Sequence, residues 1–399
     1  MRRGRGLMIG GSPIGLITLG MSQSIGSFSP LSLFAASEPG FWYDPSDLST
    51  LFQDAAGTTP VTAAGQSVGL MLDKSQGLVL GAELVTNGGF SSADGWTLNA
   101  NANISGGTLN VTSNIASGFV ANRNASIALV VGRTYEFSFT VTAITGTISA
   151  HLGGSEGIVV TAPGTYRGYI VPVSGSNIGI VARSSGVSAA TIDNISVREL
   201  PGNHATQSTS LSRPTYQVDS NGRGHLLFDG SDDFLVTPTI TPGTDKAQVF
   251  AGVRKLSDAT QAVVAGLSTN VGNPGVFMLL APSANTTADY RWSSNGSAQS
   301  SAISGATYPA PTTDILTGIG GISTDTAILR VNGAQAATSP SDQGTGNFGN
   351  YPVYIGRRGG TALPFNGRIY SLICRFGPNL TADQIAQTEA WVNARTGAY

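Results

Sequence analysis

The stretch that decides the fold is ELVTNGGFSSADGW at residues 83–96, together with ATIDNISVREL at residues 190–200. Between them, the segment TYEFSFTV at residues 134–141 places an aromatic or aliphatic residue at every second position. This period of two predicts a half-buried β-strand. Turn residues separate further short runs of the same kind, which indicates an antiparallel β-sandwich module over residues 81–200.

This module interrupts another unit. The pieces DKS at 73–75 and GNHATQSTSLSRPTY at 202–216 read as one sequence split by about 125 residues. A segment as short as residues 41–77 rarely folds alone without disulfides or metal, so we expect it to complete the domain that resumes near Pro201. A sandwich whose first and last strands are adjacent can be inserted into a surface loop. The predicted domains are an arm (1–40), a discontinuous domain (41–80 and 201–399) and an inserted module (81–200).

The discontinuous domain is also predicted to be β. Asp229-Gly230 and Asn332-Gly333 follow apolar runs and indicate hairpin turns. After Asn366-Gly367 we expect a strand with one shared face, formed by Tyr370, Leu372, Cys374 and Phe376. One helix is expected from Thr381 to about Arg395, with Thr381 and Gln384 as a capping box and with Ile385 and Val392 facing the sandwich.

The amino-acid composition argues against some classes of function and of structure. Charged residues make up 11% of the chain and the formal net charge is −2, which argues against nucleic-acid binding. The 53 glycines and the scarcity of helix formers favour β-structure with tight turns. The single cysteine, Cys374, excludes an intrachain disulfide framework.

Residues 1–40 show neither strand nor helix period. Arg2, Arg3 and Arg5 precede an apolar stretch, which suggests a signal peptide, but residues 10–13 (GGSP) interrupt that stretch. The apolar run is too short for a membrane-spanning helix, and we expect no membrane insertion. The alternative is an extended arm that becomes ordered on a partner.

Several segments resemble the concanavalin A-like (laminin-G-like) lectin domains of tailed-phage and prophage structural proteins. They are YDPSDLSTLFQD, GLMLDKS, GNHATQ, SRPTY, LLFDGSDDFLV, LRVNG, VYIGRRGG, FNGRIYSLI and LTADQIAQTEAWVNARTG. In that family DKS runs almost directly into GNHATQ, which supports the insertion. The inserted piece resembles carbohydrate-binding-module jelly rolls through its NGGF…GW opening and IDNISV closing strand. The resemblance covers residues 41–399 and implies a jelly roll carried on a concanavalin A-like sandwich.

We find no catalytic motif. The sandwich glycosidases carry alternating carboxylates on one strand, and the sequence has no such run. Asp232 and Asp233 are adjacent, so on a strand they would face opposite sides, and we interpret them as turn residues. The G-x-S-x-G and H-E-x-x-H motifs are also absent from the sequence. We therefore expect a protein that is not an enzyme.

The jelly-roll resemblance implies one metal site. Modules of this type often hold a structural calcium between the opening and closing strands, and the matching residues are Glu83, Asn87 and Asp193. The family commonly has an acidic residue where this chain has Ser91. A plain hydrogen-bonded strand junction is the alternative interpretation. No other cofactor is expected.

Sugar binding would require exposed aromatic rings with polar side chains beside them. The candidates are Trp96, Tyr166 and Tyr169 in the insert, and Tyr290, Trp292, Arg357 and Arg358 in the lectin-like domain. Trp292 lies in the polar stretch YRWSSNGSAQSS, which favours presentation to solvent. For the two arginines, gripping an acidic sugar and forming a subunit salt bridge remain equal alternatives.

The resemblance implies a phage virion protein on the virion surface, assembled in the host cytoplasm. We expect a fibre, spike or related appendage that binds host-surface polysaccharide through many weak sites on a homo-oligomer, with a trimer favoured. Residues 1–40 would bind other virion proteins. The alternatives are a purely structural decoration or tail protein and a capsule depolymerase.

Overall fold

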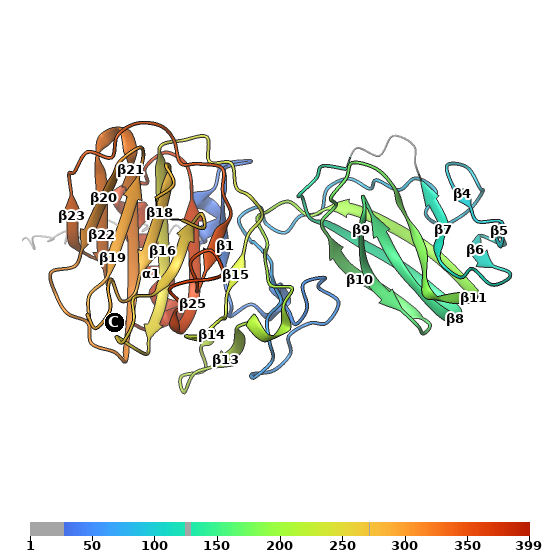
Figure 1. The fold of residues 1–399 in the computed structure, drawn as a ribbon, viewed down its shortest axis with the longest axis horizontal. Helices are drawn as coiled ribbons and strands as arrows, with labels where there is room; N and C mark the ends of the chain where they lie inside the picture. Colours follow the sequence, from blue (N-terminus) through green and yellow to red (C-terminus); the bar gives the residue numbers. More distant parts are fainter. Residues whose placement is uncertain (1–27, 124–128, 271) are drawn as a thin grey trace, which may run out of the picture.

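The computed structural model describes residues 28–123, 129–270 and 272–399. Figure 1 shows an elongated molecule with two β-rich bodies. The main sandwich is built from the chain on both sides of the inserted module, and the insert contains the strands between residues 97 and 199. The expected all-β class with one C-terminal helix is confirmed. Among the described residues, no helix is long and apolar enough to cross a membrane.

The main sandwich has two antiparallel sheets. The helix-side sheet has the order β13-β14-β25-β16-β21-β22-β23, with β1 paired to β25. Its strands are β1 (Gly40–Tyr43), β13 (Thr215–Val218), β14 (Gly224–Asp229), β16 (Lys246–Lys255), β21 (Thr312–Gly321), β22 (Thr326–Val331), β23 (Ala334–Ser339) and β25 (Asn366–Arg375). The opposite sheet contains, in spatial order, β2 (Leu51–Phe52), β3 (Leu70–Met71), β12 (Ala205–Thr206), β15 (Leu235–Val236), β24 (Val353–Ile355), β17 (Val263–Leu267), β18 (Val276–Leu280), β19 (Arg291–Asn295) and β20 (Gln299–Ile303).

Segments on either side of the insert share these sheets. β1 lies antiparallel to β25 near the C-terminus, with Phe41 opposite Cys374. β3 pairs with β2 on one side and with β12 on the other, so that Met71 faces both Leu51 and Ala205. One continuous apolar core lies between the two sheets, and residues from both segments contribute to it.

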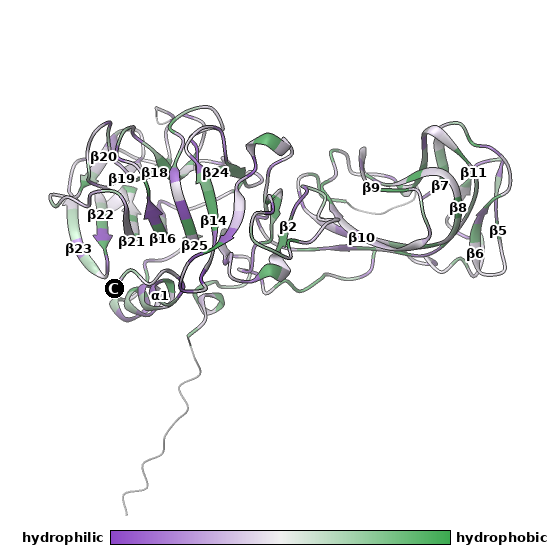
Figure 2. Ribbon diagram, turned by 90° about the horizontal axis from the view of Figure 1, so that it is seen from below, coloured by the Kyte–Doolittle hydropathy of each residue, from purple (hydrophilic) through white to green (hydrophobic). Residues whose placement is uncertain are grey.

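The insert is one eight-stranded antiparallel sheet that curls around its own core (Figure 2). Its strands are β4 (Thr97–Leu98), β5 (Ala102–Ser105), β6 (Thr108–Val111), β7 (Gly118–Arg123), β8 (Tyr135–Leu152), β9 (Ser155–Val160), β10 (Gly164–Ile170) and β11 (Ile178–Glu199). β8 and β11 pair along most of their length with several register shifts. Such irregularities bend strands, so β8 and β11 can follow the curved sheet around both sides of the core. The alternation expected over 134–141 is confirmed: Phe137 and Phe139 are buried and the residues between them are half-buried.

The structure tests two predicted hairpin turns and one predicted strand face, and it corrects two of these three predictions. Asn332-Gly333 joins β22 to β23 as a hairpin, with both residues at positive φ, as expected. The hairpin predicted at Asp229-Gly230 is wrong, because the next strand, β15, lies in the opposite sheet. The shared face predicted for Tyr370 is also wrong. A bulge leaves Tyr370 unpaired between Ile369 and Ser371, so Ile369 takes its place in the core.

The C-terminal helix α1 (Ala382–Thr396) has the predicted capping box and packs on the outer face of the helix-side sheet (Figure 2). Short 3₁₀ turns occur at η1 (Pro30–Leu33), η2 (Leu48–Thr50), η3 (Ser210–Ser212) and η4 (Ile322–Thr324). Leu33 and Phe34 pack into the cluster under α1 with Val392. Leu33 and Phe34 lie within the predicted arm, but they pack inside this chain, where Phe34 is half-buried. Predictions for residues 1–27 lie outside the described residues.

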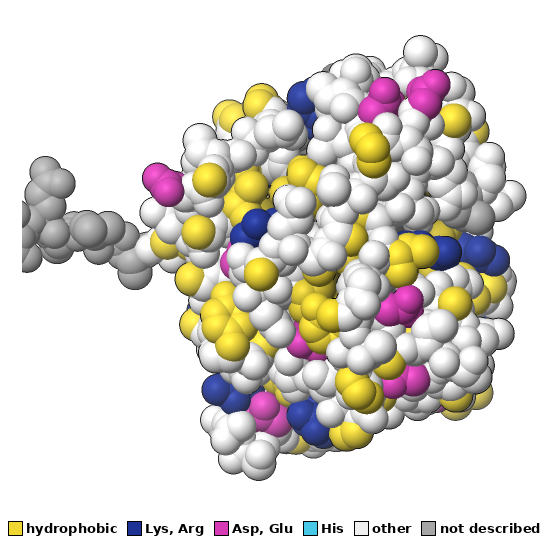
Figure 3. Space-filling view, turned by 90° about the vertical axis from the view of Figure 1, so that its left-hand side faces the viewer, with side chains coloured by type: hydrophobic (Ala, Val, Ile, Leu, Met, Phe, Trp, Pro, Cys, Tyr) yellow, Lys and Arg dark blue, Asp and Glu magenta, His cyan; other side chains and the backbone are white. Residues whose placement is uncertain are grey.

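The end of the main sandwich farthest from the insert has a mixed surface. Figure 3 shows small, separate groups of basic, acidic and apolar side chains among a majority of uncharged polar side chains and backbone. No charge of one sign dominates this face.

Candidate functional site

The split motif DKS…GNHA forms a buried hub. The Asp73 carboxylate accepts hydrogen bonds from the backbone N–H groups of Trp42, Ser75 and Asn203, each at 2.8 Å. The Ser75 hydroxyl donates to Oδ2 of the same carboxylate at 2.9 Å. The Asp73 backbone N–H in turn donates to Nδ1 of His204 at 2.9 Å. The two halves of the motif therefore meet in space although about 125 residues separate them.

The hub determines the state of His204. A backbone amide only donates, so Nδ1 is the acceptor and the ring proton sits on Nε2, which faces the carbonyl oxygen of Leu200 at 3.2 Å. Burial lowers the pKa of His204, although the nearby Asp73 opposes this effect. Both ring nitrogens have protein partners, and this histidine is a structural group rather than a general base.

Tyr169 fixes the insert against the main sandwich. Its backbone N–H donates to the carbonyl oxygen of Ala56 at 2.6 Å, and its ring contacts Phe52 edge-on with centroids 5.6 Å apart. Gly57 adopts φ +65°, and a Cβ atom there would lie 2.4 Å from the Tyr169 ring, so this contact requires glycine. The proposal that Tyr169 stacks on a sugar is wrong, because its ring is only 6% exposed and serves this junction.

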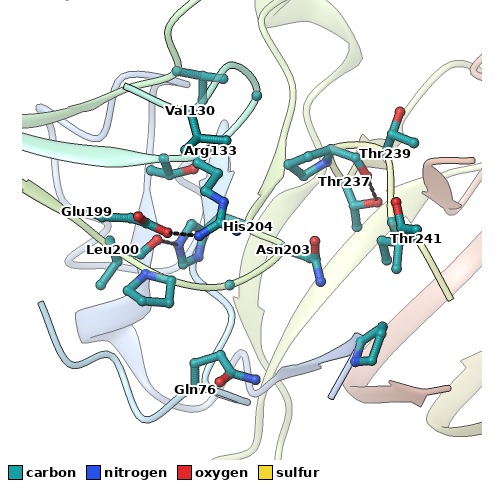
Figure 4. Close-up of a pocket in the computed structure, with 18 of the residues that line it drawn as sticks. Gln76, Val130, Arg133, Glu199, Leu200, Asn203, His204, Thr237, Thr239 and Thr241 are labelled. Atoms are coloured by element: carbon teal, nitrogen blue, oxygen red, sulfur yellow. Dashed lines mark hydrogen bonds and ion pairs between the residues drawn. The ribbon is translucent and has the colours of Figure 1, made fainter. Parts of the chain in front are cut away.

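Beside the junction lies a cleft of about 860 Å³, the candidate functional site (Figure 4). The insert contributes mostly apolar groups and one ion pair, from Val130, Val131, Val171, Arg133 and Glu199. The main sandwich contributes mostly hydroxyl and amide groups, from Gln76, Asn203, Thr237, Thr239 and Thr241. The cleft walls therefore differ: one is apolar with a charged pair, and the other is neutral and polar.

The ionisable groups that line the cleft are paired within the protein. Arg133 binds Glu199 at 2.6 Å, and this carboxylate raises the pKa of Arg133. Glu38 binds Arg375 at 2.5 Å. With His204 also engaged, every ionisable side chain among the described lining residues has a protein partner. The cleft offers hydroxyl and amide groups for hydrogen bonds and valine side chains for apolar contact.

Two predicted sugar-stacking residues lie in the core. Trp292 is 0% exposed and stacks on Phe277 with centroids 5.2 Å apart. Tyr290 is also fully buried and donates its hydroxyl to Asp314 at 2.6 Å, and burial raises its pKa. The prediction that polar neighbours would present Trp292 to solvent is wrong. Serines follow the tryptophan in a largely buried hairpin, where the Ser293 hydroxyl bonds to that of Ser301 on the next strand at 2.9 Å.

Trp96 is also structural. Its indole N–H donates to the carbonyl oxygen of Asn87 at 3.1 Å and its ring packs on Phe90. The Arg123 guanidinium covers the ring at 5.3 Å from its centroid. The ring is buried, and the prediction of a sugar contact at Trp96 is wrong.

Arg357 and Arg358 lie outside the cleft. The Arg357 guanidinium donates to the carbonyl oxygens of Asp232 and Thr361, each at 3.3 Å, and so ties two loops together. The Arg358 backbone N–H bonds to Ala362 within one of these loops. The structure therefore brings none of the predicted ligand-binding residues into the cleft.

The predicted calcium neighbourhood is a dense strand junction. The Glu83 carboxylate accepts from the backbone N–H groups of Val85 and Val197, each at 2.9 Å, and from the Ser196 hydroxyl. Arg198 lies 3.2 Å from the same carboxylate. Burial alone would raise the pKa of Glu83, but these hydrogen bonds hold it below its ordinary value. These contacts match the alternative interpretation, a hydrogen-bonded junction.

Asn87 and Asp193 are likewise engaged. The Asn87 side-chain amide donates to the carbonyl oxygens of Ser92 and Asp94, at 2.8 and 3.2 Å. Asp193 accepts from the backbone N–H of Asn194 at 2.7 Å. Calcium at these residues stays a prediction.

Asp229 at the end of β14 and Asp232 and Asp233 in the loop that follows have carboxylate oxygens within 4.8 Å of one another. They largely serve the turn expected from the sequence: Asp229 accepts from the backbone N–H of Ser231 at 2.7 Å, and Asp233 accepts from that of Asp229 at 3.0 Å. Burial, followed by the two neighbouring carboxylates, raises the pKa of Asp233 to about 7. Oxygen ligands of this kind suit a hard cation.

No protein-family model matches the chain, and no curated protein matches it. Among solved structures, the chain is similar to the binding domain of botulinum neurotoxin DC in complex with SialylT, at 10% identity and a TM-score of 0.34, over 47% of this chain and 48% of that one. It is also similar to the Ruminococcus gnavus IT-sialidase CBM40 bound to alpha2,3 sialyllactose, at 18% identity and a TM-score of 0.30, over 37% and 83%. The chain spans about half the length of the neurotoxin structure. The similarity is one of distant β-sandwich architecture and carries no argument about a ligand.

Proposed function

We propose that this protein binds glycans without catalysis, through the cleft between the insert and the main sandwich. The observation that carries the proposal is the composition of that cleft. Hydroxyl and amide groups on one wall match sugar hydroxyls, and the valines opposite suit the apolar C–H faces of a saccharide. The paired state of the ionisable lining groups supports binding rather than hydrolysis.

The cleft is suited to weak, repeated binding. It is open, and Val130 and Val131 on its wall are exposed, so a single site would bury little ligand surface. Affinity would then come from several copies of the chain acting together. With the sequence resemblance to phage lectin-like domains, this supports a virion fibre, spike or appendage that attaches to host-surface polysaccharide as a homo-oligomer.

A second function, structural packing, has its own support. Exposed valines in the cleft, Val130, Val131 and Val171, are also what a neighbouring subunit would cover. In that case the protein would be a decoration or tail component. Sedimentation velocity of the wild type and a cleft variant separates the two, because loss of oligomers in the variant favours subunit packing.

The test uses an arginine substitution that fills the cleft. Val131→Arg places a long charged side chain on the apolar wall, and Val159→Arg is the matched control, since both valines are 57% exposed and Val159 lies outside the cleft. On an array of bacterial surface glycans, we expect wild type and Val159→Arg to bind the same structures. We expect Val131→Arg to lose at least about tenfold in affinity. Equal binding by Val131→Arg, or no glycan binding by the wild type, contradicts the proposal.

A further inference from the structure

Two arginines lie side by side on the outer face of the helix-side sheet. Arg254 on β16 is directly opposite Arg368 on β25. Their chain neighbours Val253 and Ile369 belong to the inner core, so alternation turns both arginines outward. α1 covers the previous outward position on β16, because Gly252 contacts Thr396 of the helix. Arg254 therefore occupies the next outward position on β16 after the one that α1 covers, with Arg368 beside it on β25.

No carboxylate neutralises this pair among the described residues. Arg254 donates to the Thr313 hydroxyl at 3.0 Å, and the Arg368 side chain bonds to the Tyr370 hydroxyl. The Nε atoms of both arginines are buried and have no hydrogen-bond partner in the structure. Like charges directly opposite each other on neighbouring strands are destabilising, and a buried donor without a partner adds to the cost. An anion between the two guanidinium groups would offset the repulsion between them and would supply an acceptor for the unpartnered donors.

Two acidic groups at the ends of the neighbouring strands β13 and β14 are held elsewhere. Asp219 accepts from the backbone N–H groups of Asn221 and Arg223, at 2.8 and 2.9 Å, and from the Tyr370 hydroxyl at 3.3 Å. Asp229 turns its carboxylate into its own loop, where it accepts from Ser231. Neither forms an ion pair with the arginines, which leaves the two positive charges free for an external partner.

The surrounding groups also suit an oxyanion. The Thr313 hydroxyl accepts from Arg254 and can still donate its own proton to an anion. His225 stacks beside Tyr370 with centroids 4.9 Å apart. Burial first, with a contribution from Arg368, lowers the pKa of His225 to about 4, so the ring is neutral near pH 7. Guanidinium groups pair bidentately with carboxylate, sulfate and phosphate oxygens.

We propose that Arg254 and Arg368 form an oxyanion site, separate from the cleft, that binds the carboxylate or sulfate groups of an anionic polysaccharide. The oxyanion chemistry follows from the arginine pair alone. The polysaccharide as its carrier rests on the proposed function. A charged chain could then engage the sheet face while a neutral part of the glycan occupies the cleft.

Calorimetric titration at constant ionic strength tests the site. The probes are a short oligogalacturonate for carboxylate, a dextran sulfate oligomer for sulfate, and neutral dextran. We expect the wild type to bind at least one anionic probe and not the neutral one. Arg254→Gln and Arg368→Gln should each weaken that binding at least tenfold. The anionic probe that binds identifies the oxyanion.

Two matched controls make the outcome specific. Arg183→Gln removes an exposed insert arginine that pairs with Glu156, so it changes net charge equally and should leave binding unchanged. Val159→Arg adds a positive charge on the insert, outside the cleft, and should leave binding of the anionic probe unchanged. Because the anionic probes and the glycan array are separate measurements, failure of this site and failure of the cleft give different results. A further readout is the melting temperature without ligand. Relief of like-charge repulsion should keep Arg254→Gln at or above wild type, whereas a purely structural arginine would lower it.

Three results would overturn the proposal. They are absence of binding to both anionic probes, an equal loss in Arg183→Gln, and a clear fall in the unliganded melting temperature of both glutamine variants with binding retained. Should a glutamine variant fold poorly, Arg368→Lys keeps the charge and removes the planar fork. It should still lose several-fold in affinity, and unchanged affinity would argue against the site.

Discussion

At the residue scale, Phe137 is the clearest measure of the insert core. It is fully buried, and its ring meets Phe139 edge-on with centroids 5.8 Å apart. Phe137→Ala removes this packing and leaves a cavity, so we expect the isolated module to lose about 3–5 kcal/mol of unfolding free energy. Denaturant melts measure the change. Val159→Ala on the exposed side of β9 is the control, and a loss below about 1 kcal/mol for Phe137→Ala would mean that the face assignment is inverted.

His225 gives a pH-dependent prediction. Burial lowers its pKa to about 4 in the folded state, against about 6.5 in an unfolded chain. Below pH 6.5 the unfolded chain gains a proton that the folded protein cannot accept, so stability falls as pH drops from 6.5 toward 4. His225→Gln should remove this part of the acid destabilisation. Urea melts of both proteins at pH 7.5 and 4.5 check it, and equal losses in the two proteins would contradict the assignment.

At the element scale, the sequence predicted what local patterns determine. The alternation around Phe137, the capping box at Thr381 and the Asn332-Gly333 turn are each encoded within a few residues, and the structure has them. Trp292 was misplaced because its polar neighbours suggested a surface strand, whereas one of them, Ser293, bonds to Ser301 on a partner strand that local sequence does not reveal. Tyr370 was misplaced because a bulge depends on register with β16.

The junction between Glu83 and the end of β11 gives an element-scale prediction. Glu83→Gln keeps the shape but weakens the charge-assisted bonds to Val85, Val197 and Arg198. We expect the insert to lose about 1–3 kcal/mol of unfolding free energy. Asp94→Asn, in the neighbouring loop, is the control for loss of one acidic group. Melts with calcium and with EDTA test the predicted metal in the same samples, because a calcium-dependent stabilisation that Glu83→Gln abolishes would support it.

At the scale of the whole molecule, the cleft was beyond prediction from sequence. Its walls come from segments far apart in the chain, such as Val131 and Thr239, and no local pattern marks them as neighbours. The aromatic residues that attracted attention as ligand contacts are large and apolar, and for the same reason the fold uses them in its cores and at the junction. The meeting of the two halves of the hub around Asp73 could be predicted, because the sequence shows them as one interrupted motif.

The insertion is tested by deletion. Removing residues 81–200 and rejoining the chain with a short linker should leave a soluble, cooperatively folding protein, because Asp73 and Asn203 can still meet. Phe52, Leu70 and Leu72 lose their cover at the junction, so we expect reduced stability rather than unfolding. Thermal melts and sedimentation check this outcome. An unfolded remainder, combined with a well-folded fragment of residues 201–399, would show that the domains are divided differently.

Truncations of the N-terminal segment distinguish a role in anchoring from a role in folding. Residues 1–27 carry apolar residues without amphipathic period, and ordering such a segment costs roughly 1–2 kcal/mol per residue in backbone entropy, which a partner surface would have to offset. Leu33 and Phe34 instead pack under α1 in the same chain. Under the proposed virion function, deleting residues 1–27 should abolish incorporation into particles while the melting temperature stays near wild type. Deleting residues 1–35 should also lower the melting temperature, because the cluster around Val392 loses its cover. If the shorter truncation still enters particles at normal copy number, the anchor lies in the main sandwich or the insert.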